Sequence, residues 1–432
     1  MDGLDFTSTA ELAVPGSLIE QVIGQEKAVE VITLAARQRR AVLLVGQPGT
    51  GKSMLAAAMA ELMPVAGLED VIIRSNPKAR LLPLIERLPA GGGAPVVAGE
   101  QVRAQRERRA INYLVGLAAV VFLVVGAVLS LAVNRYLFIF GFLASVAILV
   151  LRRSLLSAWS PTGARVLIDR SGQDRAPFVD ATGAHAGGLL GDVRHDPFQS
   201  GGYETEPHEL VEPGAIHRAH GGVLFVDEIT SLSLESQQRL LTALQEGELA
   251  ITGRHSGSSG AMVLTEPVPC ETVLVVAANP GELEYIHPAL RSRLRGFGYE
   301  ILTADSLERT PENEVALARF VAQEVRRDGR IPHFTAAGVR AVLEEAGRRA
   351  AEGRMTLRLR ELGGLVRIAG DLAISEGARL TEAAHVQRAR GLALSVEEQL
   401  EATTPTPRPN LRTIVLSPPL PAPGGTEAGG GG

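Results

Sequence analysis

One stretch decides the fold: the apolar run Ala41-Val42-Leu43-Leu44-Val45 leads directly into Gly46-Gln47-Pro48-Gly49-Thr50-Gly51-Lys52-Ser53. An uninterrupted apolar run is typical of a buried strand in a parallel sheet. The residues after it follow the phosphate-loop pattern G-x-x-x-x-G-K-[ST], and an Ala- and Leu-rich helix is predicted from Met54 to Leu62. Because such a loop turns backbone N–H groups toward phosphates, the sequence predicts a nucleotide site, with Lys52 on the β- and γ-phosphates and Ser53 on Mg²⁺.

Two further apolar runs end in polar residues. The run from Gly222 to Val226 ends in Asp227-Glu228, and the run from Thr272 to Ala278 ends in Asn279. Because ligands gather at the carboxyl edge of a parallel sheet, we expect Asp227 to hold Mg²⁺ and Glu228 to polarise an attacking water. An amide at Asn279 can orient that water. The predicted fold class is therefore α/β, with a parallel sheet flanked by helices.

An arginine cluster follows the third predicted strand, in the stretch His287-Pro288-Ala289-Leu290-Arg291-Ser292-Arg293-Leu294-Arg295. Such a cluster is either a solvated basic patch or the source of an arginine finger for the nucleotide of a neighbouring subunit.

The apolar segment between these motifs departs most from soluble composition. Residues 113–133 carry no charge, and residues 136–151 form a second, shorter uncharged run after Asn134-Arg135. The first run as a helix would be about 31 Å long, the thickness of a bilayer core. Arginines flank both ends, which favours a membrane hairpin with two cytoplasmic ends over a buried or re-entrant segment.

The remaining chain is divided by composition. Residues 1–90 and 161–310 are predicted to form the two parts of the α/β core, and residues 91–160 a linker and the membrane insert, with the linker from Pro89 to Gly99. Helical periodicity predicts a small all-α domain over residues 311–400. Residues 401–432 are rich in Pro and Gly and are expected to be a disordered tail.

Charge, cysteine and histidine content argue against nucleic-acid binding, disulfide bonds and a zinc site. Lys+Arg is 43 and Asp+Glu is 48, a net charge of −5, which argues against a nucleic-acid partner. The single cysteine, Cys270, excludes an intrachain disulfide and is expected to be a small buried residue. Among the histidines only His217 and His220 have a metal-like spacing, so we favour packing roles over zinc for them and for His195, His208 and Asp196. Because the N-terminus is acidic and has no apolar run, we expect no secretory signal peptide.

Taken together, the sequence resembles an AAA+ ATPase, and in particular the membrane-anchored, archaeal-type Lon protease. The stretches that carry this resemblance lie at residues 21–30 (QVIGQEKAVE), 46–53 (GQPGTGKS), 178–202, 211–229, 258–270, 287–293 (HPALRSR) and 357–371 (LRLRELGGLVRIAGD). The resemblance covers the chain from about Phe6 to Leu400.

The resemblance implies ATP and Mg²⁺ as cofactors and a homo-oligomeric ring, expected to be a hexamer. It implies that Val22, Ile23 and Gly24 line the adenine pocket, Asn279 is the first sensor, and Arg293, with Arg291 beside it, is the finger. Arg358 is the expected second sensor, with Arg360 as the alternative, and the remaining helical domain is the lid. His185 falls near a substrate-gripping pore loop, with loop packing as its alternative. The family also implies protein substrates and a multi-pass location in the cell membrane, with the ATPase in the cytosol.

The sequence departs from the family where a protease domain with a Ser-Lys pair would follow the lid. The three lysines are Lys27, Lys52 and Lys78, so no lysine lies beyond residue 78. Arginine cannot replace a lysine base because it does not deprotonate near neutral pH. We therefore expect a motor without its own peptidase site: a truncated gene, one half of a split enzyme with a separate protease subunit, or a motor with another partner. The alternative is a remodelling ATPase similar to MoxR or the chelatases, without proteolysis.

Overall fold

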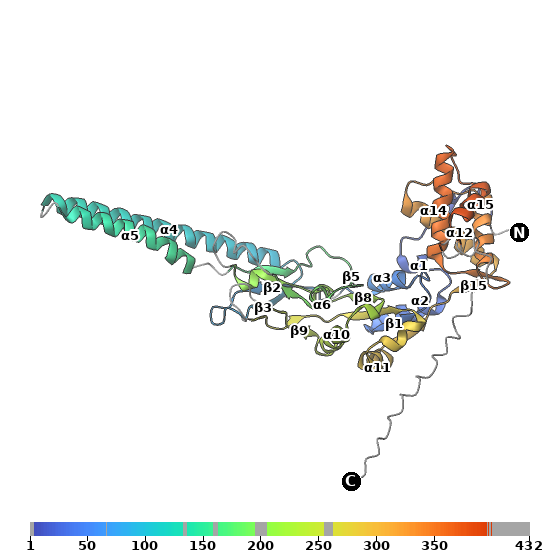
Figure 1. Ribbon diagram of the computed structural model, residues 1–432, viewed down its shortest axis with the longest axis horizontal. Coiled ribbons are helices and arrows are strands. Elements are labelled where there is room, and N and C mark those ends of the chain that lie inside the picture. Colours follow the sequence, from blue (N-terminus) through green and yellow to red (C-terminus); the bar gives the residue numbers. More distant parts are fainter. Residues whose placement is uncertain are drawn as a thin grey trace, which may run out of the picture.

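The computed structural model describes residues 4–65, 67–132, 136–158, 163–194, 205–254 and 262–394, together with Val396 and Gln399. The predicted tail, the turn at Asn134-Arg135, and His195 and Asp196 lie outside the described residues. The described chain is elongated, with a long helix pair at one end, a helical domain at the other, and an α/β core between them (Figure 1).

The core is a parallel sheet of five strands in the order β14-β1-β13-β8-β5. These strands are β1 (Val42–Val45), β5 (Phe178–Asp180), β8 (Val223–Asp227), β13 (Val273–Ala278) and β14 (Tyr299–Leu302). The predicted α/β class and its three predicted core strands are confirmed. Strands β1, β8 and β13 are buried almost throughout, as expected for strands covered on both faces.

Helices cover both faces of this sheet. Alternate residues of β1 point to opposite faces: Val42 and Leu44 pack under α2 (Glu26–Gln38) and α3 (Lys52–Leu62). Leu43 and Val45 pack against the other group of helices. That group contains α6 (Ala186–Leu190), α9 (Ala215–Arg218), α10 (Leu234–Glu246) and α11 (Pro288–Phe297). Short α1 (Leu18–Gln21) precedes α2, and α8 (Pro207–Leu210) precedes α9.

A second, antiparallel sheet of three strands, in the order β3-β2-β4, carries the helix pair. Its strands are β2 (Glu69–Arg74), β3 (Leu84–Pro89) and β4 (Arg165–Ile168). Helix α4 (Gly93–Ala132) follows β3, and α5 (Leu137–Ala158) leads back toward β4 (Figure 1). The predicted linker is wrong beyond Gly92, because α4 begins at Gly93. Pro95 fits there, since a helix's first turn does not use its N–H groups.

The two helices of the pair lie antiparallel and very close together. An ideal Cβ on Gly141 would lie 2.7 Å from the Cα of Gly126 on the facing helix, so only a residue without a side chain fits at this crossing. Among the described residues, α4 is the helix that is long and apolar enough to span a membrane, while α5 contains the shorter apolar run Phe138–Ile148. Two membrane-spanning helices are therefore not established by length and composition alone.

The remaining short strands join the parts of the core. They are β6 (Asp192–Val193), which pairs with β7 (Val211–Glu212); β9 (Glu248–Leu249), which pairs with β12 (Val268–Pro269); and β10 (Thr252–Arg254), which pairs with β11 (Met262–Leu264). Val71 and Ile73 of β2 pack against apolar residues of these strands, and Ile72 packs against the first turns of α4. The three-stranded sheet is thus held between the helix pair and the core.

The helical domain has its own hydrophobic core. It contains α12 (Pro311–Asp328), α13 (Ala336–Arg348), α14 (Leu359–Ser375) and α15 (Ala383–Leu392), and a hairpin of β15 (Ser306–Glu308) with β16 (Arg354–Thr356). These four helices lie within residues 311–400, where helical periodicity predicts an all-α domain. The N-terminal segment is attached to this domain: Leu4 is buried in its core, and the Thr9 N–H donates to the carbonyl oxygen of Phe334 at 2.8 Å.

Candidate nucleotide-binding site

The phosphate loop connects β1 to α3 at the carboxyl edge of the core sheet. Gly49 and Gly51 have φ values of +83° and +88°, in the left-handed region that glycine adopts without strain. At Gly46 an ideal Cβ would lie only 1.8 Å from the hydroxyl oxygen of Thr303, so a side chain cannot fit there. The sequence pattern therefore has a direct steric cause at these positions.

Lys52 points its ammonium group back into this loop. The Nζ donates to the carbonyl oxygens of Gly46 at 2.7 Å and Gln47 at 3.2 Å, and to the Oδ1 of Asn279 at 3.3 Å. The side chain is buried, and this burial lowers the pKa of Lys52, an effect that the negative charge of Asp227 opposes. Three acceptor oxygens, of Gly46, Gln47 and Asn279, thus hold the ammonium group of Lys52 beside the phosphate loop.

Asp227 and Glu228 lie at the end of β8, two strands away from the phosphate loop. The Asp227 N–H donates to the hydroxyl of Thr182 at 3.0 Å, and the Glu228 N–H donates to the Oδ1 of Asp227 at 3.0 Å. Glu228 has a φ of +51°, a left-handed conformation that is uncommon for a residue with a side chain. Strained conformations of this kind cluster at functional sites.

Asn279 ends β13, the strand between β1 and β8. Its Nδ2 donates to the Oε1 of Glu282 at 2.8 Å, while its Oδ1 accepts from Lys52. Glu282 therefore fixes which way the amide faces. Glu282 and Thr182 were not predicted from the sequence, because no motif or spacing marks them.

The helical domain touches the phosphate loop through the start of α14. The Leu359 N–H donates to the carbonyl oxygen of Gly49 at 3.0 Å, and an ideal Cβ on Gly49 would lie 2.9 Å from the Cβ of Arg360. Arg360 is also near enough for its charge to lower the pKa of Lys52, although burial lowers that pKa more. Arg358 instead lies 3.8 Å from the carboxylate of Glu361. The structure thus brings Arg360 to the loop.

The predicted adenine segment, Val22, Ile23 and Gly24, lies between the core and the helical domain. Ile23 is buried among the apolar residues of the helical domain, whereas Val22 packs with the apolar residues of α2 and α3 that cover one face of the core sheet. An ideal Cβ on Gly24, whose φ is +65°, would lie 2.8 Å from Leu357. A base bound here would therefore contact both domains.

The two candidate finger arginines lie on α11. Arg293 donates to the carbonyl oxygen of Leu244 at 3.4 Å, and its guanidinium lies 5.4 Å from the ring centre of Phe297. Arg291 is paired with Glu300 at 3.1 Å. Neither arginine is among the charged groups that act on Lys52 within one chain.

The remaining candidates sit in packing environments. Burial raises the pKa of the Cys270 thiol to about 12, and burial lowers the pKa of His217 to about 4. His208 is buried, and His220 lies 3.5 Å from Glu69. His185 directly precedes α6. Within the part of the chain that the structure describes, no three His, Cys, Asp or Glu side chains are grouped so as to hold a metal ion.

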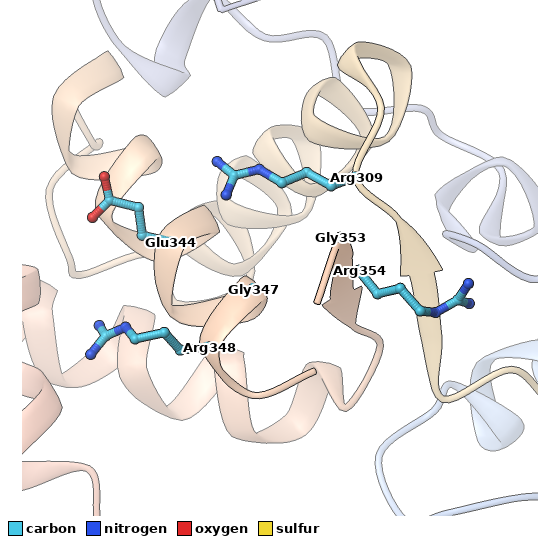
Figure 2. Close-up of a pocket in the computed structure, with 6 residues that line it drawn as sticks. All are labelled: Arg309, Glu344, Gly347, Arg348, Gly353 and Arg354. Carbon is cyan, nitrogen blue, oxygen red and sulfur yellow. The ribbon is translucent and has the colours of Figure 1, made fainter. Parts of the chain in front are cut away.

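A cavity of about 370 Å³ lies in the helical domain, lined by residues of α13 and of the β15–β16 hairpin region (Figure 2). Three of its lining residues are arginines, but each has a polar partner: Arg309 pairs with Glu314, Arg348 with Glu345, and Arg354 with Ser306. The arginine heads do not meet at one point: Arg309 and Arg348 extend to one side of the view and Arg354 to the other (Figure 2). None of the residues that line this cavity belongs to the phosphate loop or to the strand ends at Asp227 and Asn279.

Three family profiles match separate parts of the chain. Residues 18–78 match the magnesium chelatase ChlI subunit, residues 164–264 match the sigma-54 interaction domain, and residues 333–391 match the lid domain of archaeal LonB AAA+ ATPases. The matched segments contain the phosphate loop, the Asp-Glu strand, and the part of the helical domain from α13 to α15.

Whole-chain comparisons agree with the lid profile. Archaeal Lon proteases of Archaeoglobus fulgidus and Thermococcus kodakarensis are 53% and 52% identical to the chain over 401 residues, which are 93% and 92% of this chain. The chain spans 64% and 62% of the length of those two proteins. A putative Lon protease homolog of Methanothermobacter thermautotrophicus is 35% identical, and 91% of its length is covered. The chain therefore belongs to the archaeal Lon family, of which it contains the AAA+ ATPase part.

Proposed function

We propose that this chain is an ATP-hydrolysing motor that unfolds and moves protein substrates. One observation carries the proposal: the candidate residues lie at the ends of three neighbouring strands, β1, β13 and β8. Lys52 begins the helix after β1, Asn279 follows β13, and Asp227 and Glu228 lie at the end of β8. Lys52 already contacts Asn279. Such a cluster at the carboxyl edge of a parallel sheet can position a triphosphate, a metal ion and a water together.

Each residue has a role suited to its chemistry. The Ser53 hydroxyl and the Asp227 carboxylate are hard oxygen ligands that would hold Mg²⁺, which shields phosphate charge. Glu228 would accept a proton from the attacking water, and Asn279, held by Glu282, would orient that water. We assign the second-sensor role to Arg360 rather than Arg358, since Arg360 lies against the phosphate loop.

The test uses two lysines of the same chain. Purified wild-type chain is expected to hydrolyse ATP only with Mg²⁺, and Lys52→Ala is expected to lose both nucleotide binding and hydrolysis. Lys78→Ala is the matched control, because Lys78 is exposed and far along the chain from the loop. Unchanged hydrolysis in Lys52→Ala would refute the proposal.

We further propose that the helix pair crosses a membrane. Large apolar side chains are exposed along both helices, including Phe122, Leu131 and Phe140. Exposing this apolar surface costs free energy in water but not in lipid. Lys52 follows β1 and Asp227 ends β8, two strands of one sheet, but the helix pair separates them in sequence. The number of crossings must therefore be even, so both parts of the ATPase lie on one side of the membrane. The arginines that flank the apolar segment favour the cytosolic side.

Cysteine labelling tests this topology. In a Cys270→Ser background, single cysteines at positions 100, 134 and 160 are expected to react with an impermeant reagent from outside the cell only at position 134. Labelling from outside at position 100 or 160 would contradict the two-crossing arrangement.

We propose no peptidase site within these residues, because a Ser-Lys pair requires a lysine and none lies between Lys78 and residue 432. From the resemblance to Lon, we propose a homo-oligomeric, hexameric ring and a protease site outside these residues. Casein incubated with the chain, Mg²⁺ and ATP is expected to stay intact. Cleavage that disappears in Glu228→Gln would show a peptidase activity driven by this ATPase.

A further inference from the structure

Gln25 makes a set of contacts that its sequence position does not explain. It directly precedes α2, where a side chain commonly caps its own helix, but its side chain makes no such bond. Instead the Nε2 donates to the carbonyl oxygens of Thr50 at 3.3 Å and Ala304 at 2.8 Å. The Oε1 accepts from the Ala304 N–H at 2.9 Å, and the side chain is buried.

The first partner, Thr50, belongs to the phosphate loop, two residues before Lys52. A phosphate loop binds anions only while its N–H groups face the site and its carbonyl oxygens face away. The Nε2 of Gln25 donates to one of these carbonyl oxygens, that of Thr50. The Thr50 hydroxyl, in turn, lies 2.9 Å from the hydroxyl of Thr303.

The second partner, Ala304, lies in the connection from the core to the helical domain. Residues 303–305 join β14 of the core sheet to β15 of the helical domain. The next residue, Asp305, accepts from the Leu357 N–H at 2.8 Å, just before Arg358 and Arg360. A shift of the helical domain would therefore move Asp305 and, with it, the neighbouring Ala304 that Gln25 contacts.

We propose that Gln25 is a positioning residue for ATP binding, which keeps the phosphate loop in its anion-binding shape and ties that shape to the core–lid connection. This inference rests on the proposed ATPase function and extends it to a residue outside the loop. Gln25 acts on the nucleotide only through Thr50 and Ala304, so it is not a catalytic residue.

The test is the steady-state kinetics of Gln25→Ala in the full chain. Loss of the contact to Thr50 leaves the loop free to turn inward, so KM for ATP is expected to rise about tenfold. Saturating ATP holds the loop in place by itself, so kcat is expected to stay within about twofold. A merely misfolded fraction would lower kcat and leave KM unchanged.

Two comparisons make the result specific. Gln21→Ala is the matched control, because Gln21 donates to the carbonyl oxygen of Pro15 at 2.8 Å, outside the loop, and its KM should equal that of the wild type. The rise in KM should be equal for ATP and ITP, because the defect lies at the phosphates. A larger rise for ATP than for ITP would mean that Gln25 serves the base pocket, and would overturn the proposal.

Gln25→Glu keeps the result decisive if Gln25→Ala does not fold. The carboxylate keeps the acceptor for the Ala304 N–H but removes both donated bonds, so KM should again rise. A folded Gln25→Glu with wild-type KM would overturn the proposal while leaving the ATPase intact. Absence of hydrolysis in the wild type would instead refute the function on which the proposal rests.

Discussion

Arg358 directly precedes α14 and has a non-helical ψ of 67°, whereas Arg360 lies in the first turn of the helix. From these different backbone positions, Arg360 packs on the phosphate loop at Gly49, and Arg358 reaches toward Glu361. Arg360→Ala is expected to lower kcat about a hundredfold, as for the loss of one donor to a developing phosphate charge. Arg358→Ala should stay within about twofold of wild type. Steady-state ATPase assays decide the matter, and the reverse order would return the sensor role to Arg358.

The residues of the site divide by how they could be recognised. Lys52, Ser53, Asp227, Glu228 and Asn279 follow from motifs, because each stands directly at the end of an apolar run or in the phosphate loop. Glu282, Thr182 and Gln25 act on these residues through hydrogen bonds set by loop geometry. No periodicity or spacing in the sequence encodes that geometry.

At the scale of elements, a buried carboxylate joins α4 to the core. Asp70 of β2 is fully buried; its Oδ2 accepts from the Gly93 N–H at 2.8 Å, and its Oδ1 accepts from the Arg170 N–H at 2.7 Å. The guanidinium of Arg170 then donates to the carbonyl oxygens of Arg218 and His220. This chain of contacts connects the first residue of α4 to the segment that precedes β8.

Asp70→Asn is expected to weaken this joint, because an amide can accept only one of the two N–H groups and presents its own donor to the other. The cost of an unsatisfied buried donor is about 1–3 kcal/mol. Hydrogen exchange should therefore speed up at the first amides of α4, with a small drop in Tm. Asp169→Asn is the control, since Asp169 is exposed and bonds only to nearby Ser171. Unchanged exchange in Asp70→Asn would mean that the carboxylate does not hold the helix.

Strands β2 and β3 of the small sheet that carries the helix pair are among the parts of the fold that the sequence did not predict. Strand β3 is only half-buried and reads Leu-Ile-Glu-Arg-Leu-Pro, without clean alternation, and β2 begins with charged residues. Strands β1, β8 and β13 were predicted because burial on both faces leaves an unbroken apolar run. A strand with one face on a neighbouring sheet and the other partly in solvent leaves a weaker pattern.

At the scale of the whole molecule, one chain brings together the candidate residues for phosphate, metal and water, while Arg293 is not part of that cluster. Arg293 makes one long hydrogen bond and a contact with Phe297, whereas Arg291 is held by Glu300. Arg293 is therefore the better candidate to act on the nucleotide of a second copy in a ring. A finger supplied in this way stabilises charge that develops on the transferred phosphate.

Mixing two inactive variants tests this arrangement. Glu228→Gln should bind ATP but hydrolyse it at least about a hundredfold more slowly, because it lacks the base, and Arg293→Ala should bind ATP without hydrolysing it. In mixed oligomers, an Arg293→Ala subunit keeps its own Glu228 and can receive Arg293 from a Glu228→Gln neighbour. Part of the activity should therefore return in the mixture, measured as phosphate release at constant total protein.

Arg295 is an exposed arginine on the same helix, so Arg295→Ala is the matched control and should stay active alone. Normal hydrolysis by Arg293→Ala alone would exclude it as the finger, and failure of the mixture to recover would mean that the two residues serve the same nucleotide from one chain.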